Sequence, residues 1–419
     1  MNVLNRRSFF KILGGLSLPA WFPRLAFSSS PERQSAQRDV LVCIFQRGAA
    51  DGMNIVVPVG ESNYYDNRKT IAIPHPAAGS ATAAIDLDGF FGLHPALAPL
   101  KDLFDQKALA PIHAVGSPDP SHSHFDAQDY MERGTPGSKS IATGWINRHL
   151  QALNAAGDSD NSPFRAVGIG TLLQASLRGP VPATALKSIA DFHLGGKGAA
   201  IQAFQATLSS LYADNSWLDI QGTETFNAIS SLAAANPTAY QPKNGAKYPN
   251  SGFGMAMSQV AQLIRASLGL EIACVDLGGW DTHHAQGGPT GAMARLLADL
   301  AGGLAAFYTD MGDQMKNVTV VTMSEFGRRL LENASGGTDH GHGNCMFVLG
   351  GGVNGGKVYS NWPGLAPDRL ASPGDLQVTT DFRTVLAEIV DRRLLNPALD
   401  QVFPNFQVPG YLGIVQPAS

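Results

Sequence analysis

The stretch 317–344 constrains the fold of this chain more than any other part of the sequence. It opens on the β-branched run VTVVT, which is typical of a strand covered on both faces. Glu325 and Arg328 follow this strand, and Asp339 and His340 come a few residues later among glycines. Ligands of open α/β sheets bind outside the carboxyl ends of the strands, and carboxylates and imidazoles are good metal ligands. We therefore predict that Glu325, Asp339 and His340 bind a metal ion; the alternative is a solvated glycine-rich loop with incidental histidines.

Two further apolar runs also end in polar side chains. The run 40–46 (VLVCIFQ) leads into Arg47 and Asp51, and a later run leads through two glycines to Asp281 and His283. These last two residues stand two positions apart, so an extended backbone points both side chains the same way. We predict that Asp51, Asp281 and His283 join the metal site, although Asp51 could also be an ordinary turn residue.

The strand predicted over 109–115 leads into a polar loop and then into a helix. Ser123 and Asp126 have the spacing of an acidic capping box, which places the Ser123 hydroxyl at the N-terminus of the helix. That position favours binding of phosphate or sulfate, and it favours a nucleophilic hydroxyl if a metal or a histidine is near. We predict catalytic roles for Ser123 and its neighbour His124; the alternative is that Ser123 only caps the helix.

The first residues have the pattern of an export signal. Arg6 and Arg7 precede an aromatic pair and a lysine, and a weakly apolar run follows to about residue 22. This pattern is typical of a twin-arginine signal, whose partner during export is the twin-arginine translocase. The apolar run is too short and too broken to serve as a permanent membrane span. We predict that residues 1–37 are signal peptide and linker, and that the rest of the chain is periplasmic or secreted.

The composition indicates a large folded chain with no nucleic-acid partner. The 419 residues are 44% hydrophobic and 15% charged, with a net charge of −4 and no basic stripe. The three cysteines, Cys43, Cys274 and Cys345, lie in apolar runs and are odd in number, so we expect buried thiols rather than a disulfide framework. β-Branched runs alternate with amphipathic helices, which predicts one three-layer α/β/α domain over 38–419 with a mainly parallel central sheet and a helical insertion at about 180–250.

Five motifs together resemble an exported bacterial family of unknown function, numbered 1501, that is sulfatase-like in fold. They are, in order, RGAADGMNIVVP, SHSHFDAQDYMERG, GGWDTHHAQ, SEFGR and GTDHGHGN. The set also resembles, more loosely, the alkaline phosphatase and sulfatase superfamily, in which an early Asp, a helix-capping nucleophile, an Asp–His pair and a late Asp-His bind one or two metals. Two departures stand out. Phe326 occupies a position where that superfamily has a metal ligand, and Asp281 and His283 are closer in sequence than the superfamily's pair.

The resemblance implies a metal-dependent hydrolase of small anionic esters of phosphate or sulfate. It implies one or two divalent metal ions, with zinc expected, and Ser123 as the nucleophile. Arg47 or Arg328 would neutralise the substrate anion. The alternative is a non-catalytic exported protein that keeps the fold and binds a ligand or partner, which Phe326 favours.

Overall fold

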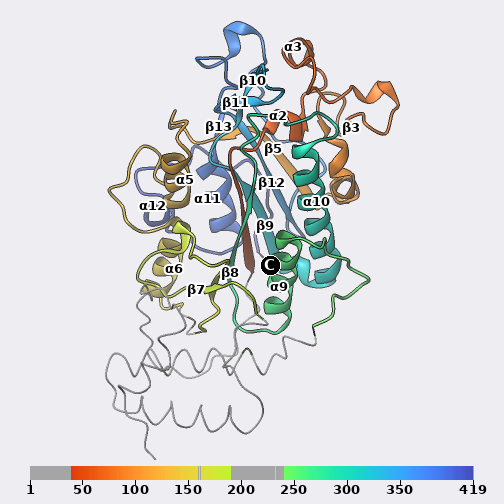
Figure 1. Ribbon diagram of the computed structural model, residues 1–419. Helices are drawn as coiled ribbons and strands as arrows, with labels where there is room; N and C mark the ends of the chain where they lie inside the picture. Colours follow the sequence, from red (N-terminus) through yellow and green to blue (C-terminus); the bar gives the residue numbers. More distant parts are fainter. Residues whose placement is uncertain (1–38, 159, 161, 190–231, 233–239, 419) are drawn as a thin grey trace, which may run out of the picture.

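The centre of the structure is a sheet of eight strands in the order β13-β5-β12-β9-β1-β8-β6-β7 (Figure 1). The computed structural model describes residues 39–158, 160, 162–189, 232 and 240–418. In the sheet, β1 pairs in parallel with β8 and β9, and β12 runs antiparallel to both of its neighbours, β5 and β9. The strands are β1 Val40–Arg47, β5 Leu109–Gly116, β6 Ala166–Ile169, β7 Thr184–Leu186, β8 Ile272–Gly278, β9 Val318–Met323, β12 Asn344–Gly350 and β13 Thr380–Asp381.

Side chains alternate between two hydrophobic cores along the central strand β1. Val42 and Ile44 face one core, which contains residues of α9 (Gly252–Arg265) and α10 (Ala292–Met311). Cys43 and Phe45 face the other, which contains residues of α6 (Trp145–Ala155) and α11 (Phe382–Arg392). Because a strand points successive side chains to opposite faces, the apolar run 40–45 of β1 must be covered on both sides. The predicted three-layer α/β/α fold with a mainly parallel sheet is confirmed (Figure 1).

Short elements complete the described part of the chain. Its shorter helices are α2 Gly52–Ile55, α3 Ser62–Asn67, α4 Lys101–Asp105, α5 His124–Arg133 and α12 Leu399–Val402. The 3-10 turns are η1 Pro76–Ala78, η2 Pro95–Leu100, η3 Ala175–Leu177, η5 Gly312–Asn317 and η6 Pro367–Arg369. Two small sheets consist of β2 Val56–Val57, β3 Ile85–Asp86 and β4 Gly92–Leu93, and of β10 Arg328–Glu332 and β11 Thr338–His340. The segment predicted as a histidine-rich loop is therefore partly the strand β11, paired antiparallel with β10.

Two of the predictions fall largely on residues that the structure does not describe. The signal peptide and linker, 1–37, lie wholly outside the described residues. Most of the predicted helical insertion at about 180–250 also lies outside them, and the described residues Thr184–Leu186 within it form the edge strand β7 rather than a helix. The prediction of a single domain over 38–419 stays a prediction.

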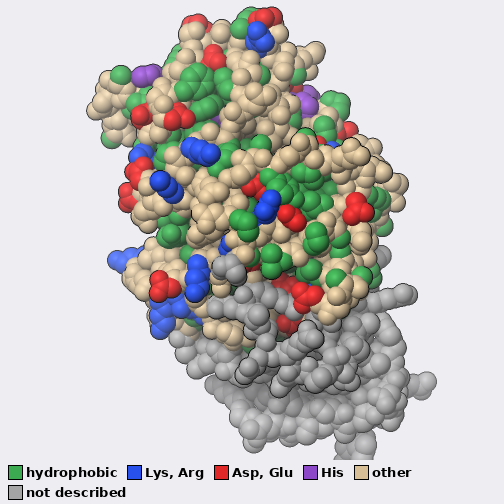
Figure 2. Space-filling model, turned by 180° about the vertical axis from the view of Figure 1, so that it is seen from behind, with side chains coloured by type: hydrophobic (Ala, Val, Ile, Leu, Met, Phe, Trp, Pro, Cys, Tyr) green, Lys and Arg blue, Asp and Glu red, His purple; other side chains and the backbone are tan. Residues whose placement is uncertain are grey.

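Charged side chains are mixed over the face of the molecule shown in Figure 2. Lysine and arginine residues alternate there with aspartate and glutamate residues, and no broad area of one sign is visible on the described part of this face. Among the described helices, none is long and apolar enough to cross a membrane.

Candidate metal centre

The carboxyl ends of β1, β8 and β9 meet at one edge of the sheet, at the top of Figure 1. These strands are parallel and adjacent, so the residues that follow them enter the same region. The hairpin β10–β11 lies at this edge with Arg328 opposite His340, and α5 begins beside it at His124. Segments far apart in the sequence thereby bring polar side chains together.

Three imidazole side chains converge around one oxygen atom, Asp281 Oδ1. It lies 3.1 Å from His283 Nε2, 3.2 Å from His340 Nε2 and 3.5 Å from His124 Nε2. The Nε2 atoms of His283 and His340 are 2.8 Å apart. We call these four residues the histidine–aspartate cluster. Its Asp281 side chain is 49% exposed, so solvent and small ligands reach it.

The other ring nitrogen of each histidine in this cluster is held by an oxygen atom. The Nδ1 partners are Glu325 Oε1 for His124 (2.7 Å), the carbonyl of His122 for His340 (2.9 Å) and Asp339 Oδ1 for His283 (3.2 Å). Carbonyl and carboxylate oxygens only accept hydrogen bonds, so each Nδ1 donates. In the neutral ring, each Nε2 then presents a lone pair to the cluster.

This donor set fits a metal ion. Three Nε2 lone pairs face a carboxylate oxygen, and such groups repel one another unless a cation lies between them. Within the described part of the chain, His124 Nε2 is buried and has no hydrogen-bond partner. One ligand atom each from His124, Asp281 and His340 lie within 4.8 Å of one another. Imidazole nitrogen and carboxylate oxygen are the ligands of zinc sites in proteins.

Glu325 and Asp339, which the sequence predicts as metal ligands, lie behind two of the histidines and accept hydrogen bonds from their Nδ1 atoms. Glu325 Oε1 also accepts hydrogen bonds from the Gly48 N–H and Gln128 Nε2, both at 2.8 Å. Burial acts to raise the pKa of Glu325, but the hydrogen bonds from His124 and Gln128 outweigh it and lower the pKa. The hydrogen bond that His124 donates to Glu325 also raises the pKa of His124. A carboxylate behind a ligating histidine fixes its tautomer and ring orientation.

Asp339 acts in the same way on His283. Its Oδ1 accepts from Asn333 Nδ2 at 3.0 Å as well as from His283. The hydrogen bond from Asn333, opposed by burial and reinforced by His283, lowers the pKa of Asp339. The carboxylate is thus ionised at neutral pH and accepts from the imidazole N–H.

Arg328 positions Asp281 and is not available to a substrate. Its side chain is fully buried, and its NH2 donates to Asp281 Oδ1 at 2.8 Å. Burial acts to raise the pKa of Asp281, but the hydrogen bond from Arg328 and its positive charge outweigh burial, and the pKa is about 2. The other Arg328 donors bind backbone carbonyls, namely those of Gly48, Ala49, Trp280 and Thr338. Arg328 therefore joins the turns after β1 and β8 to the hairpin, and its donors are engaged within the protein, so its contact with a substrate anion stays a prediction that these bonds do not favour.

Arg47 is also committed to partners within the protein. Its guanidinium contacts Asp276 Oδ1 at 2.8 Å and Glu132 Oε2 at 2.9 Å. It also donates to Gln128 Oε1 at 3.3 Å. Two carboxylates neutralise this one charge, so the predicted role of Arg47 in binding a substrate anion is not favoured by the structure.

Asp51 lies in a buried ion pair rather than among the cluster residues. Both of its carboxylate oxygens accept from Arg68, at 2.5 and 3.0 Å, and one also accepts from Gln286 at 2.7 Å. The side chains of Asp51 and Arg68 are fully buried. A carboxylate that is already neutralised and hydrogen-bonded is a poor metal ligand, so this placement does not favour the predicted role of Asp51.

Ser123 is where the sequence predicts it, at the N-terminus of α5. Its hydroxyl accepts a long hydrogen bond, 3.5 Å, from the backbone N–H of Asp126. Consecutive Cα atoms are about 3.8 Å apart, so Ser123 lies within one residue of a cluster member, His124. Ser123 thus adjoins a cluster residue along the chain, and the chemical role of its hydroxyl stays a prediction.

Phe326 packs against two histidines of the histidine–aspartate cluster. Its ring stacks on His124 with a centroid distance of 5.1 Å and lies 4.9 Å from the ring of His340. It also contacts His122 edge-on at 5.9 Å. The residue that replaces an expected metal ligand thus supports the imidazoles by packing.

Two contributions are not predicted by the sequence reasoning. The first is the position of His124 Nε2 beside Asp281 and His340, where it could hold a metal ion, which the S-H-S-H pattern before α5 could have suggested. The second is Gly48, whose φ of +117° disfavours a side chain and whose added Cβ would lie 2.6 Å from the backbone nitrogen of Asp281. The glycine after β1 therefore lets the Asp281 turn approach closely.

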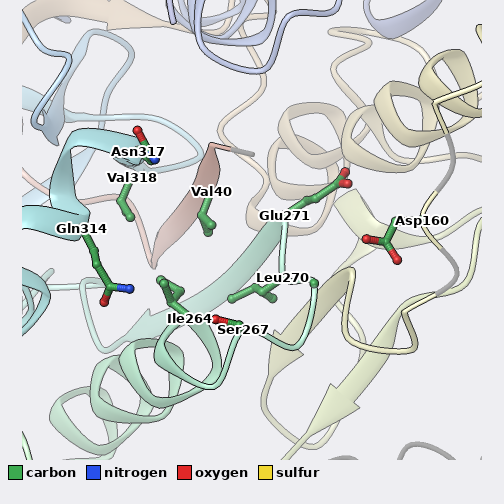
Figure 3. Close-up of a pocket in the computed structure, with 10 residues that line it drawn as sticks. Val40, Asp160, Ile264, Ser267, Leu270, Glu271, Gln314, Asn317 and Val318 are labelled. Atoms are coloured by element: carbon green, nitrogen blue, oxygen red, sulfur yellow. The ribbon is translucent and has the colours of Figure 1, made fainter. Parts of the chain in front are cut away.

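A pocket of about 370 Å³ lies at the opposite edge of the sheet (Figure 3). The residues that line it include Val40, Leu270 and Val318, at or next to the amino ends of β1, β8 and β9. In open α/β sheets ligands bind at the carboxyl edge, so we assign the candidate functional site to the histidine–aspartate cluster.

The fold and the site define an α/β/α protein with a candidate metal centre at the carboxyl edge of its sheet. The chain belongs to a family of proteins of unknown function, DUF1501, whose model matches residues 107–404. No curated protein matches the sequence.

Several solved structures are similar to this one at low scores. The C-terminal periplasmic domain of EptC from Escherichia coli, in complex with Zn, has a TM-score of 0.35 and 8% identity over 76% of this chain and 74% of that one. The PsFucS1 sulfatase from Pseudoalteromonas sp. has a TM-score of 0.34 and 10% identity over 90% and 73%. The lipoteichoic acid synthase LtaP from Listeria monocytogenes has a TM-score of 0.34 and 8% identity over 89% and 76%. At these scores the similarities say nothing about what this chain does.

Proposed function

We propose that this chain is an exported, metal-dependent hydrolase of phosphate or sulfate esters. The observation that carries the proposal is the convergence of three Nε2 lone pairs and Asp281 Oδ1 at a solvent-reached edge of the sheet. His124, His283, His340 and Asp281 would hold a divalent ion, with zinc expected. When bound, such an ion supplies Lewis-acid stabilisation of negative charge that develops on the reacting ester.

Ser123 is the proposed nucleophile. Its hydroxyl stands at the N-terminus of a helix of ten residues, where free backbone N–H groups and the helix dipole favour negative charge. The hydrogen bond from Asp126 uses only one hydroxyl lone pair, so the Ser123 O–H can still donate. Because Arg47 and Arg328 are committed elsewhere, we assign binding of the substrate anion to this helix terminus beside the cluster.

A second candidate is a non-catalytic protein that binds a metal or a ligand with the same fold. Phe326 favours it, since an aromatic ring packs under His124 and His340 where the resembling superfamily has a further ligand. The sequence suggests Arg47 and Arg328 for binding the substrate anion, and both are engaged by other groups of the protein, which also fits this candidate.

Metal content and turnover test the proposal together. The purified mature chain is analysed for bound metal and assayed with a panel of aryl phosphate and sulfate esters. We expect about one equivalent of zinc or more and measurable turnover, and loss of both in His340→Ala but in neither for the surface control Lys101→Ala. Metal without turnover would favour the binding protein. Absence of both metal and turnover would reject the hydrolase and also favour the binding protein, with a ligand other than a metal.

We also propose export through the twin-arginine route, which rests on Arg6 and Arg7. Replacement of both with lysine should hold the precursor in the cytoplasm, as seen by fractionation. Unchanged accumulation in the periplasm would reject this route.

A further inference from the structure

We propose a second metal site in this protein, for a soft monovalent cation such as Cu(I), formed by Cys43, Cys274 and Met323. The site lies within the hydrophobic core on the α6 side of the sheet, which contains all three residues. It does not depend on the proposed hydrolase function, because it shares no residue with the histidine–aspartate cluster.

The two thiols are brought together by the register of the sheet. Cys43 on β1 is the direct partner of Cys274 on β8. Neighbouring strands lie about 4.8 Å apart, and partners in register point to the same face. Both thiols are free of disulfide bonds, and a hydrogen bond with Cys43, together with burial, raises the pKa of Cys274. Two thiols therefore face one another in the core.

Met323 supplies a third sulfur from the strand on the other side of β1. Its Sδ lies 3.6 Å from Cys43 Sγ. Three sulfurs around one ion at about 2.3 Å, the length of a zinc–thiolate bond, would be roughly 4 Å from one another, so this separation needs little adjustment. Thiolate and thioether ligands together select Cu(I), whereas zinc in structural sites takes four ligands.

A small void lies next to the three sulfur-bearing residues. Its volume is about 10 Å³, and Cys43, Cys274 and Met323 all line it together with Arg47. Ser176 Oγ lies 3.8 Å from Cys274 Sγ on the same side. Arg47 lines the void together with Glu132 and Asp276, the two carboxylates that neutralise its charge, so it adds no net positive charge beside the two thiolates. The void is also of a size to hold one water, so water is the competing occupant.

The proton balance of binding gives a second signature. One Cu(I) replaces the protons of both thiols, so the products are a bis-thiolate complex of Cu(I) and two released protons. Because both protons must leave, the apparent affinity should rise with pH, by up to about a hundredfold per pH unit below the thiol pKa values. A cation held by neutral imidazoles would lose this dependence near neutral pH.

Competition for Cu(I) tests the site. The reduced mature chain is titrated with Cu(I) under anaerobic conditions in the presence of bicinchoninate. We expect one tightly bound ion, with affinity lowered about a hundredfold or more in Cys43→Ala and Cys274→Ala and about tenfold in Met323→Leu. The matched control is Cys345→Ala, a buried cysteine that faces the opposite core, and His340→Ala excludes the histidine–aspartate cluster.

The outcomes separate cleanly. The site is supported if Cys345→Ala and His340→Ala keep tight Cu(I) binding while Met323→Leu loses Cu(I) affinity. This comparison holds even if the cysteine variants fail to fold. Equal binding in Met323→Leu and the unsubstituted chain would overturn the site. Failure of the protein to compete with bicinchoninate for Cu(I) would also overturn the site and leave the void to water. A count of one free thiol after unfolding would overturn it too, because it would show a disulfide between Cys43 and Cys274.

Discussion

The fully buried guanidinium of Arg328 donates a 2.8 Å hydrogen bond to Asp281, whose carboxylate is 49% exposed. The buried Arg328 thus holds the Asp281 carboxylate in place, and Asp281 is the residue of the pair that solvent reaches. Asp281 Oδ1 can accept from Arg328 and still face the three imidazole Nε2 atoms, because a carboxylate oxygen accepts from several directions.

Arg328→Lys should destabilise the protein strongly. Lysine keeps the charge but loses the fork of donors that binds the carbonyls of Gly48, Ala49, Trp280 and Thr338. We expect the free energy of unfolding in urea to fall by about 3 kcal/mol, the scale of an interrupted buried ion-pair network. Arg369→Lys, at a side chain that is 66% exposed, serves as the control. Equal unfolding curves for the two variants would contradict this role for Arg328.

Glu325→Gln should weaken metal binding without removing a ligand. The carboxylate holds His124 Nδ1 and two further donors, and loss of such a partner typically costs about tenfold to a hundredfold in affinity. The measurement is competition for zinc with a chromophoric chelator. Asp105→Asn, on the exposed face of α4, should leave the affinity unchanged. An unchanged zinc affinity in Glu325→Gln would contradict the role of Glu325 in holding His124.

Asp51→Asn should lower stability and spare the metal site. The substitution leaves the Arg68 guanidinium buried without its counter-charge. We expect a loss of about 3 kcal/mol in the free energy of unfolding. The zinc stoichiometry of the folded variant should equal that of the unsubstituted chain. If folded Asp51→Asn binds less zinc per chain than the unsubstituted chain, Asp51 is a metal ligand as the sequence predicts.

Acid should destabilise the fold through His113. This ring is fully buried, it lies 2.9 Å from the carbonyl of Val56, and burial lowers its pKa from 6.5 to about 4. The unfolded chain therefore binds more protons between these two values. The stabilisation, about 3 kcal/mol, is fully present above pH 6.5 and is lost as pH falls towards 4.

The His113 prediction is checked by urea unfolding at several pH values. His113→Gln should reduce the dependence between pH 6.5 and 4 by up to about one proton. His75→Gln, which replaces an exposed histidine that only caps η1, should leave the slope unchanged. An unaltered slope in His113→Gln would mean that other groups cause the acid sensitivity.

The sequence by itself determined the layers of the fold and the edge where the site lies. Apolar runs such as VLVCIFQ can only be strands covered on both faces, and a parallel sheet then gathers the polar residues that follow them. This reasoning correctly places Asp281, His283 and His340 together, because each follows or adjoins a strand whose direction the pattern fixes.

Only the tertiary structure decided what each polar side chain does there. Glu325 and His124 are 201 positions apart, and Arg328 and Asp281 are 47 apart, yet these contacts place one side chain in the cluster and the other behind it as its hydrogen-bond partner. Asp51 leaves the ligand set for the same reason, since Arg68 neutralises it in the core. Local sequence sets where a side chain leaves the sheet. The partner it meets is set by how distant segments pack, because hydrogen bonds and ion pairs act only over a few ångströms.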